Sequence, residues 1–119
     1  MSEDRVVLCG ANAYEQKYYF NKDFDKLPQS VQDELHIICV LFTEDAGGIF
    51  TISFAEDGDV LLETEAAEED LLYDEVSAGL LVAELQRRRR ELFQSLKLFY
   101  KMFILKEQID IDSLTEEDL

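Results

Sequence analysis

Residues 49–65, "IFTISFAEDGDVLLETE", contain two strand-like segments on either side of a turn. Phe50, Ile52 and Phe54 occupy every second position, which is the periodicity of a strand with one buried face. The Asp-Gly pair within "EDGD" is typical of a tight hairpin turn, and "DVLLETE" supplies the returning arm. The stretch therefore predicts a β-hairpin around which the remaining elements pack.

Two further strands are predicted ahead of this hairpin. Residues 6–10, "VVLCG", form a short β-branched run that ends at Gly10. Residues 16–20, "QKYYF", are rich in the aromatic residues that favour strands. Both segments are expected to extend the hairpin into an antiparallel sheet.

A helix is predicted between these strands and the hairpin, because apolar residues recur there at steps of three and four. The recurring residues are Val31, Leu35, Ile38, Cys39 and Phe42. Pro28 suits a first helical turn, and Gly47 and Gly48 suit a left-handed C-terminal cap. A buried strand through "HIICVLF" is the alternative. The proline and the glycine pair favour the helix because they bracket one element of helical length.

Residues 67–105 predict a long helix that begins at the acids Glu68, Glu69 and Asp70. A sevenfold apolar row runs through Leu71, Ala78, Leu85, Leu92 and Phe99. At 1.5 Å per residue the unbroken helix would be about 58 Å long. A compact domain of this size spans only about 35 Å. The helix must therefore project, kink near its middle, or pack against a second copy.

These elements predict an α+β fold, in which the long C-terminal helix packs across an antiparallel sheet. Residues 1–106 are expected to form one domain, followed by an acidic tail at 107–119 that frays. The expected core comprises Val7, Leu35, Ile38, Phe42, Phe50, Ile52, Phe54, Leu61, Val76, Leu80, Leu92, Phe99 and Phe103.

Composition narrows the classes of function. The chain has 119 residues, 47% of them hydrophobic, so it is expected to fold as a single globular domain. A formal net charge of −16 argues against nucleic acids and anionic membrane surfaces as partners. No signal-peptide pattern and no apolar run of membrane-spanning length is visible. The sequence predicts a cytoplasmic protein.

Residues 84–93, "ELQRRRRELF", place Arg87, Arg88, Arg89 and Arg90 side by side in this acidic chain. Consecutive helical residues are separated by 100°, so the four side chains are expected to ring the helix. Three interpretations stay open: a solvated band near acidic elements, a charge zipper with a second protomer, and a site for an anionic ligand or acidic partner. Nucleic acid is the least supported because the surrounding charge is repulsive.

No strong catalytic or metal-binding motif is present. Cys9 and His36 suggest a thiol–imidazole dyad, but nothing indicates that they meet, and both Cys9 and Cys39 are expected to be buried apolar residues. Two thiols and one imidazole cannot complete a four-ligand zinc site. A carboxylate run is expected to be a solvated acidic face; it comprises Glu63, Glu65, Glu68, Glu69, Asp70 and Asp74. No metal and no cofactor are predicted.

Three stretches resemble a known family: "LCGANAYEQKYYFN", "LPQSVQDELHIICVLFTEDAGGIFTISF" and the helix start "LLYDEV". The chain is similar over nearly its whole length to short acidic bacterial proteins, mostly of Firmicutes, that are grouped as a domain of unknown function. The resemblance implies one complete domain and brings no catalytic residues with it.

The leading hypothesis is a non-enzymatic cytoplasmic interaction protein, a homodimer through residues 78–103 that binds a protein or peptide partner. The partner site would be Arg87, Arg88, Arg89 and Arg90. The dimer interface would comprise Leu85, Leu92, Leu96, Phe99 and Phe103. One alternative is a small-molecule or ion-sensing module that uses the arginine ring or the acidic patch. Another is an enzyme that uses Cys9, which would need a thiol of depressed pKa.

Overall fold

The computed structural model of the chain describes residues 5–105. Its strands are β1 (Val6–Asn12), β2 (Lys17–Phe20), β3 (Ile49–Phe54) and β4 (Val60–Glu65). Its α-helices are α1 (Gln29–Ala46), α2 (Glu75–Arg88) and α3 (Arg90–Phe103), and a short 3-10 turn, η2, covers Lys22–Phe24. The expected acidic tail lies outside the described residues.

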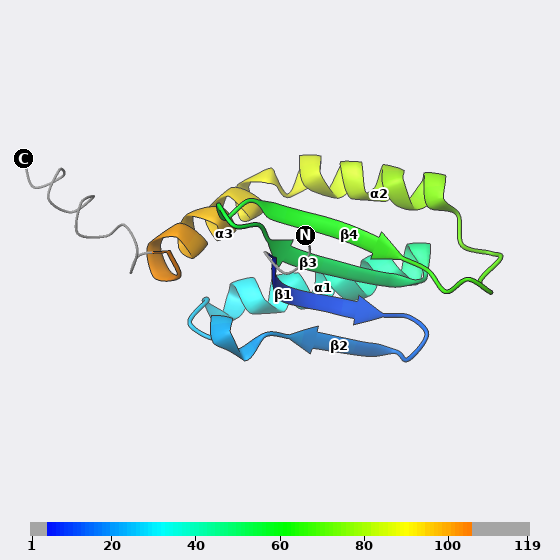
Figure 1. Ribbon diagram of the computed structural model, residues 1–119, viewed down its shortest axis with the longest axis horizontal. Coiled ribbons are helices and arrows are strands. Elements are labelled where there is room, and N and C mark those ends of the chain that lie inside the picture. Colours follow the sequence, from blue (N-terminus) through cyan, green and yellow to red (C-terminus); the bar gives the residue numbers. More distant parts are fainter. Residues whose placement is uncertain (1–4, 106–119) are drawn as a thin grey trace, which may run out of the picture.

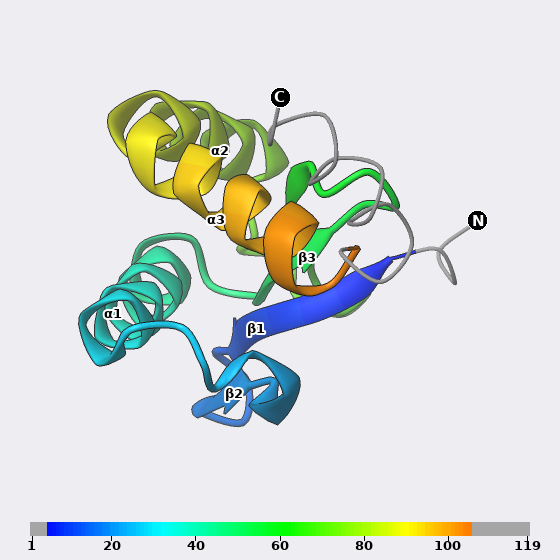
Figure 2. The ribbon, with the colours of Figure 1, turned by 90° about the vertical axis from the view of Figure 1, so that its left-hand side faces the viewer.

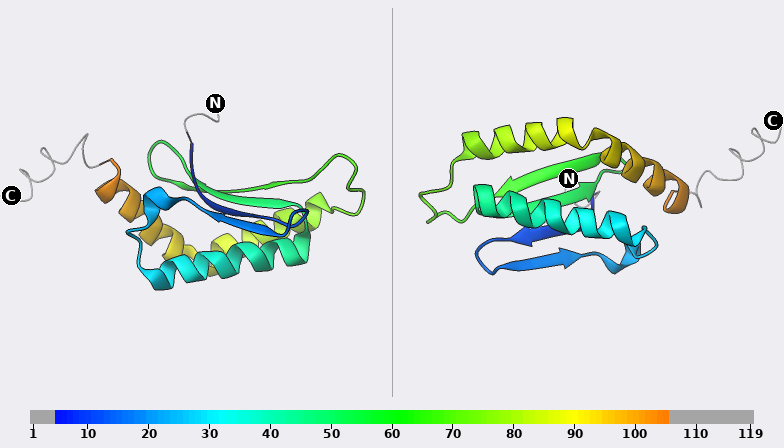
Figure 3. Two further views of the ribbon diagram at one scale, coloured as in Figure 1. Left: turned by 90° about the horizontal axis from the view of Figure 1, so that it is seen from below. Right: turned by 180° about the vertical axis from the view of Figure 1, so that it is seen from behind.

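The four strands form one antiparallel sheet in the order β2-β1-β3-β4. Figure 1 shows this sheet with β2 at one edge and β4 at the other. The three helices cover one face of the sheet, and no helix among residues 5–105 covers the other (Figure 3). The C-terminal helix α3 packs on β4. The α+β fold predicted from the sequence is confirmed.

The predicted hairpin is formed by β3 and β4. Ile52 lies opposite Leu62, and Phe54 lies opposite Val60, so the apolar positions of the two strands share the helix-covered face. Gly58 adopts a φ of 95° in the turn, a conformation that glycine accepts readily. The local sequence therefore specified both the pairing and the position of the turn.

Strand β1 contains an irregularity that the sequence did not reveal. Its register against β3 shifts between Val7 and Cys9, as in a β-bulge. Leu8 and Cys9, although adjacent, are consequently both fully buried, whereas Val7 is exposed on the open face. The prediction of Val7 as a core residue is wrong because the bulge breaks the simple alternation of faces.

The helical interpretation of residues 31–46 is confirmed, and the strand alternative is excluded. Helix α1 buries Leu35, Cys39 and Phe42 against the sheet. It ends where the Gly47 N–H donates to the Thr43 carbonyl, with Gly47 and Gly48 both at positive φ. The glycine pair thus ends the helix with positive φ angles, as the sequence predicted.

The long C-terminal helix is shorter than predicted, and it is broken. Helix α2 begins at Glu75, where the Asp74 carboxylate caps it by accepting from the Val76 and Ser77 N–H groups. The Ser77 hydroxyl, which also donates to this carboxylate, and the two backbone N–H groups lower the pKa of Asp74. The acids predicted to start the helix at residues 68–70 lie in the turns before it.

The break falls at Arg89. This residue has φ −110° and ψ 29°, and it separates α2 from α3. Figure 2 shows the two helices following different directions over the sheet. The sequence left three ways for the long helix to fit the domain, and the chain adopts the kink. An unbroken helix would extend beyond the edge of the sheet.

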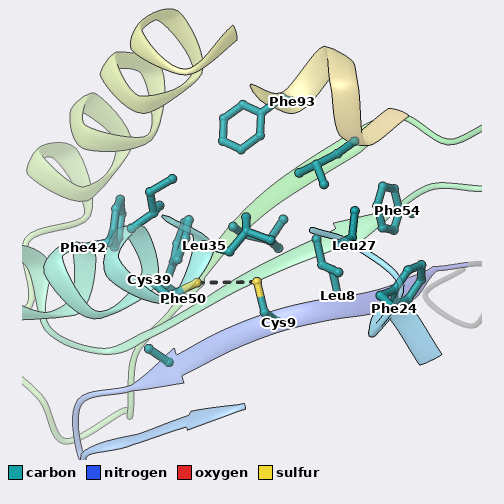
Figure 4. Packing of buried hydrophobic residues seen from close by; sticks show 14 of the residues in the cluster. Leu8, Cys9, Phe24, Leu27, Leu35, Cys39, Phe42, Phe50, Phe54 and Phe93 are labelled. Carbon is teal, nitrogen blue, oxygen red and sulfur yellow. Dashed lines mark hydrogen bonds between the residues drawn. The ribbon is translucent and has the colours of Figure 1, made fainter. Parts of the chain in front are cut away.

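The core lies between the sheet and the helices (Figure 4). Six of the predicted core residues are buried: Leu35, Ile38, Phe42, Phe50, Ile52 and Phe54. Three are half-buried: Leu61, Leu92 and Phe99. Three more besides Val7 are exposed, so the prediction is wrong for Val76, Leu80 and Phe103. The core also includes residues that were not predicted, among them Leu8, Phe24, Leu27, Phe93, Leu96 and Tyr100. The sevenfold row stays on the inward side from Ala78 to Phe99, whereas Val76, Leu80 and Phe103 lie off that row and are exposed.

Candidate partner-binding surface

The arginine cluster, Arg87–Arg90, lies at the joint between α2 and α3. Arg87 and Arg88 occupy the last turn of α2, where positive side chains interact favourably with the helix dipole. The carboxylate of Glu84 lies 3.0 Å from Arg88 Nε and 3.5 Å from Arg87 Nη2. A single carboxylate is thus shared between two guanidinium groups, and both remain largely exposed to solvent.

Arg89 has a structural role at this joint. Its guanidinium donates a hydrogen bond to the carboxylate of Glu34, which lies on α1. The ion pair connects the kink between α2 and α3 to the neighbouring helix. Among the residues that the structure describes, Arg90 takes part in no ion pair.

All four arginines line one hollow of about 580 Å³, together with Glu34 and Glu91. The sequence predicted that four consecutive helical side chains would ring the helix. Because Arg89 leaves the helical conformation, they instead border a common space. With the Glu84 partner of Arg87 and Arg88 included, four guanidinium groups stand against three carboxylates, so one net positive charge remains here, which suits an anionic group.

An apolar groove adjoins this hollow. It lies between α1 and α2, has a volume of about 200 Å³, and is lined by apolar side chains that include Ile37, Leu41 and Leu81. Ile37 and Leu41 are more than half exposed. Arg88 and Arg89 line both the groove and the cationic hollow. An apolar side chain and a carboxylate of one ligand could therefore be bound next to each other.

A second hollow, of about 610 Å³, lies between β2 and α1. Its polar lining includes Asn12, Lys17 and Glu44. The ring of Tyr18 stacks on His36 at a centroid distance of 4.1 Å and forms one wall. This site could not be seen in the sequence, because residues 12–18 and 36–44 meet only when β2 and α1 lie side by side. The aromatic pair in "QKYYF" was the available signal.

Most of the predicted dimer interface faces the interior of the protomer. Leu96 is only 1% exposed, and it belongs to the core of the chain itself. Leu85, Leu92 and Phe99 are partly buried against the same core. Phe103 is exposed at the end of α3. The apolar row predicted for a partner is therefore largely used to hold α2 and α3 on the sheet.

The two cysteines face each other inside the core. Cys9 on β1 and Cys39 on α1 are both fully buried, and their sulfur atoms lie 3.7 Å apart (Figure 4). The contact with Cys9 and burial raise the pKa of the Cys39 thiol. His36 is exposed and stacks on Tyr18, and no hydrogen bond within residues 5–105 joins it to Cys9. The structure does not assemble the thiol–imidazole dyad.

We expect both native thiols to resist an aromatic disulfide reagent near neutral pH, because both are buried out of reach of the reagent and the raised pKa of Cys39 keeps that thiol protonated. Unfolding in denaturant should release two equivalents of thiol per chain. A Ser95→Cys variant serves as the control, since Ser95 is exposed beside the arginines and its thiol should react at once. Rapid reaction of the unmodified native protein, followed by absorbance, would contradict the buried assignment.

The acidic run shows no sign of a cation site. Its members extend along β4 and the turns before α2. Within residues 5–105, three or more histidine, cysteine or carboxylate groups nowhere gather around a common point. No helix in the described part of the chain is both long enough and apolar enough to span a membrane.

A family model described as "Family of unknown function (DUF6145)" matches residues 5–108. The match covers nearly the whole chain and confirms the resemblance inferred from its motifs. No curated protein and no solved structure matches the chain. The fold and the surface features therefore carry the functional argument.

Proposed function

We propose that this chain, which belongs to the family of unknown function DUF6145, is a non-enzymatic cytoplasmic interaction protein. It forms a homodimer and binds an acidic segment of a partner protein or peptide. The non-enzymatic role is supported by the lack of a catalytic motif in the sequence and by the burial of both thiols. The cytoplasmic location is supported by thiols that lie in contact without being linked.

One observation carries the partner assignment: Arg88 and Arg89 line both the apolar groove and the cationic hollow. A segment that places an apolar side chain between α1 and α2 would direct the flanking carboxylates towards the arginine cluster. Guanidinium groups bind carboxylates through paired hydrogen bonds, which adds specificity to the attraction. The groove provides an anchor that a simple charged surface lacks.

The existing ion pairs do not prevent such binding. Glu84 and Glu34 are already held by the arginines, which shows that these side chains can reach carboxylates. Both pairs are exposed, and exposed pairs contribute about 1 kcal/mol or less. A partner carboxylate could therefore share or replace them at small cost, and Arg90 is available for a further contact.

The test is a fluorescence anisotropy titration with a short labelled peptide in which leucines alternate with glutamates. A glutamine version of the same peptide is the matched ligand control. We expect the glutamate peptide to bind more tightly, with an affinity that falls as salt rises. Arg88→Glu combined with Arg90→Glu should weaken binding by roughly tenfold or more, since it reverses two charges of the hollow and leaves the Arg89–Glu34 ion pair in place.

The control variant is Lys22→Glu combined with Lys26→Glu, which changes the net charge equally at exposed residues away from the groove. It should bind the peptide with nearly unchanged affinity at moderate salt. Equal losses in the two variants would show that only net charge matters. An affinity that is the same for both peptides would also contradict the proposed site.

A second candidate function is a small-molecule sensing module, and the hollow between β2 and α1 favours it. A stacked Tyr18–His36 wall with amide, ammonium and carboxylate groups nearby is typical of sites for planar polar ligands. The Tyr18 hydroxyl is buried without a hydrogen-bond partner among the described residues. NMR shifts of the His36 ring on addition of a nucleoside would support this function, and unchanged shifts would contradict it.

A further inference from the structure

Helix α2 has two apolar faces, and its own chain uses only one. Ala78 is buried, and Leu81, Val82 and Leu85 pack against the core on the same side. On the opposite side, Val76 and Leu80 are 73% and 66% exposed. Ala83 and then Arg87 continue this outward face at helical spacing, and both are exposed.

Two further exposed apolar side chains lie in the turn before the helix. Leu71 and Leu72 are 90% and 95% exposed. Single exposed leucines are ordinary on protein surfaces. Four large apolar side chains within residues 71–80, all of them mostly exposed, instead indicate a surface that another molecule covers.

Gly79 adds a second observation. Glycine inside a helix costs about 1 kcal/mol relative to alanine, and it allows another backbone to approach closely. Here no atom lies within 4 Å of the position that a Cβ would occupy. The packing of the protomer therefore does not require a glycine at this position, whereas a closely approaching helix would.

Charge along this surface is polarised. The N-terminal end of α2 and the turn before it carry Glu68, Glu69, Asp74 and Glu75. The C-terminal end carries Arg87 and Arg88 with Glu84 as their shared partner, so it keeps one net positive charge. A second copy placed antiparallel brings each acidic end to a basic end. A parallel copy would place like charges together, which is unfavourable.

We propose that the outward face of α2 binds the same face of a second copy, with the two helices antiparallel. A two-fold axis near Leu80 makes the contact self-complementary, so each protomer contributes both an acidic and a basic end. This inference rests on the homodimer of the proposed function and supplies its interface. The outward face of α2 takes the place of the dimer interface predicted from the sequence, whose central residue, Leu96, faces the interior of the protomer.

The first test is the solution mass by light scattering across a concentration series. The unmodified chain should reach twice its mass of 13.8 kDa. Leu80→Lys should halve that mass without unfolding the chain, because the side chain is exposed. Leu98→Lys is the matched control, since Leu98 is similarly exposed on α3. Its mass should not change.

Cross-linking tests the orientation. Near the two-fold axis, Leu80→Cys should form a covalent dimer under mild oxidation. Arg87→Cys should not, because antiparallel helices separate the two copies of residue 87 by roughly 20 Å at 1.5 Å per residue. Cross-linking at both positions would indicate a parallel pair and overturn the inference. Cys9 and Cys39 do not interfere because they are buried.

The outcomes separate this inference from the proposed function. A chain that stays monomeric at every concentration overturns both the inference and the homodimer. A dimer that Leu80→Lys leaves intact, or that Leu98→Lys disrupts, overturns only the assigned surface. Peptide binding by the monomeric Leu80→Lys variant tests the partner site independently, because neither the groove nor the cationic hollow is lined by Leu80.

Discussion

Replacement of Phe54 by alanine is expected to lower the free energy of unfolding by about 3–5 kcal/mol, the range for truncation of a buried phenylalanine. The ring is fully buried. Its centroid lies 4.5 Å from that of Tyr100 on α3 and 5.3 Å from that of Phe24 in η2. The cavity would therefore loosen three elements at once, since one side chain connects β3, α3 and η2.

The measurement is a urea titration followed by far-ultraviolet circular dichroism. Phe103→Ala is the matched control, because Phe103 is 55% exposed and packs mainly on Phe99 at a centroid distance of 4.7 Å. That variant should lose about 1 kcal/mol or less. Similar losses at the two positions would show that residue 103 belongs to the core after all, as the sequence pattern suggested.

Gly48→Ala is expected to be the second most damaging single change. Gly48 has a φ of 71°, which an L-residue adopts only with strain. A Cβ there would lie 2.5 Å from the Glu65 carbonyl oxygen and 2.8 Å from a ring carbon of Tyr73. Relief of this overlap would have to move backbone of β4, so we expect a loss of about 3 kcal/mol or more.

Gly47→Ala is an internal control for this prediction. Its φ of 78° carries a comparable conformational cost, but nothing lies within 4 Å of its Cβ position. The loss should be limited to about 1–2 kcal/mol of backbone strain. The difference between the two variants in urea titrations then measures the steric overlap. Equal losses of unfolding free energy in the two variants would mean that the backbone of β4 at Glu65 moves aside at little cost, which would contradict the prediction.

The elements that were predicted correctly are those specified by neighbouring residues. The alternation through Phe50, Ile52 and Phe54, with an Asp-Gly turn after it, requires no distant contact to favour a hairpin. The same holds for α1, whose apolar stripe is bracketed by Pro28 and Gly47. Local periodicity and turn chemistry act over a few residues, so a single sequence displays them directly.

The candidate site was predicted in part. The arginine cluster can be read directly from the sequence. A kink near it was one of the three solutions that the length of the predicted helix left open. Its groove was not predictable, because Ile37 and Leu41 meet Arg88 and Arg89 only when α1 and α2 lie side by side. The hollow beside His36 was missed for the same reason, since it lies between β2 and α1.

The sequence by itself predicted the α+β fold, the hairpin and the helix within residues 31–46. It also showed that the C-terminal helix is too long for its domain, and left open whether it projects, kinks or packs against a second copy. Only the tertiary structure decided which apolar residues of the C-terminal segment are buried. Sevenfold spacing cannot distinguish Leu96, which packs on the sheet, from Phe103, which is exposed. The reason is physical: periodicity defines a face, whereas burial depends on what that face meets, and Phe103 stands at the last position of α3.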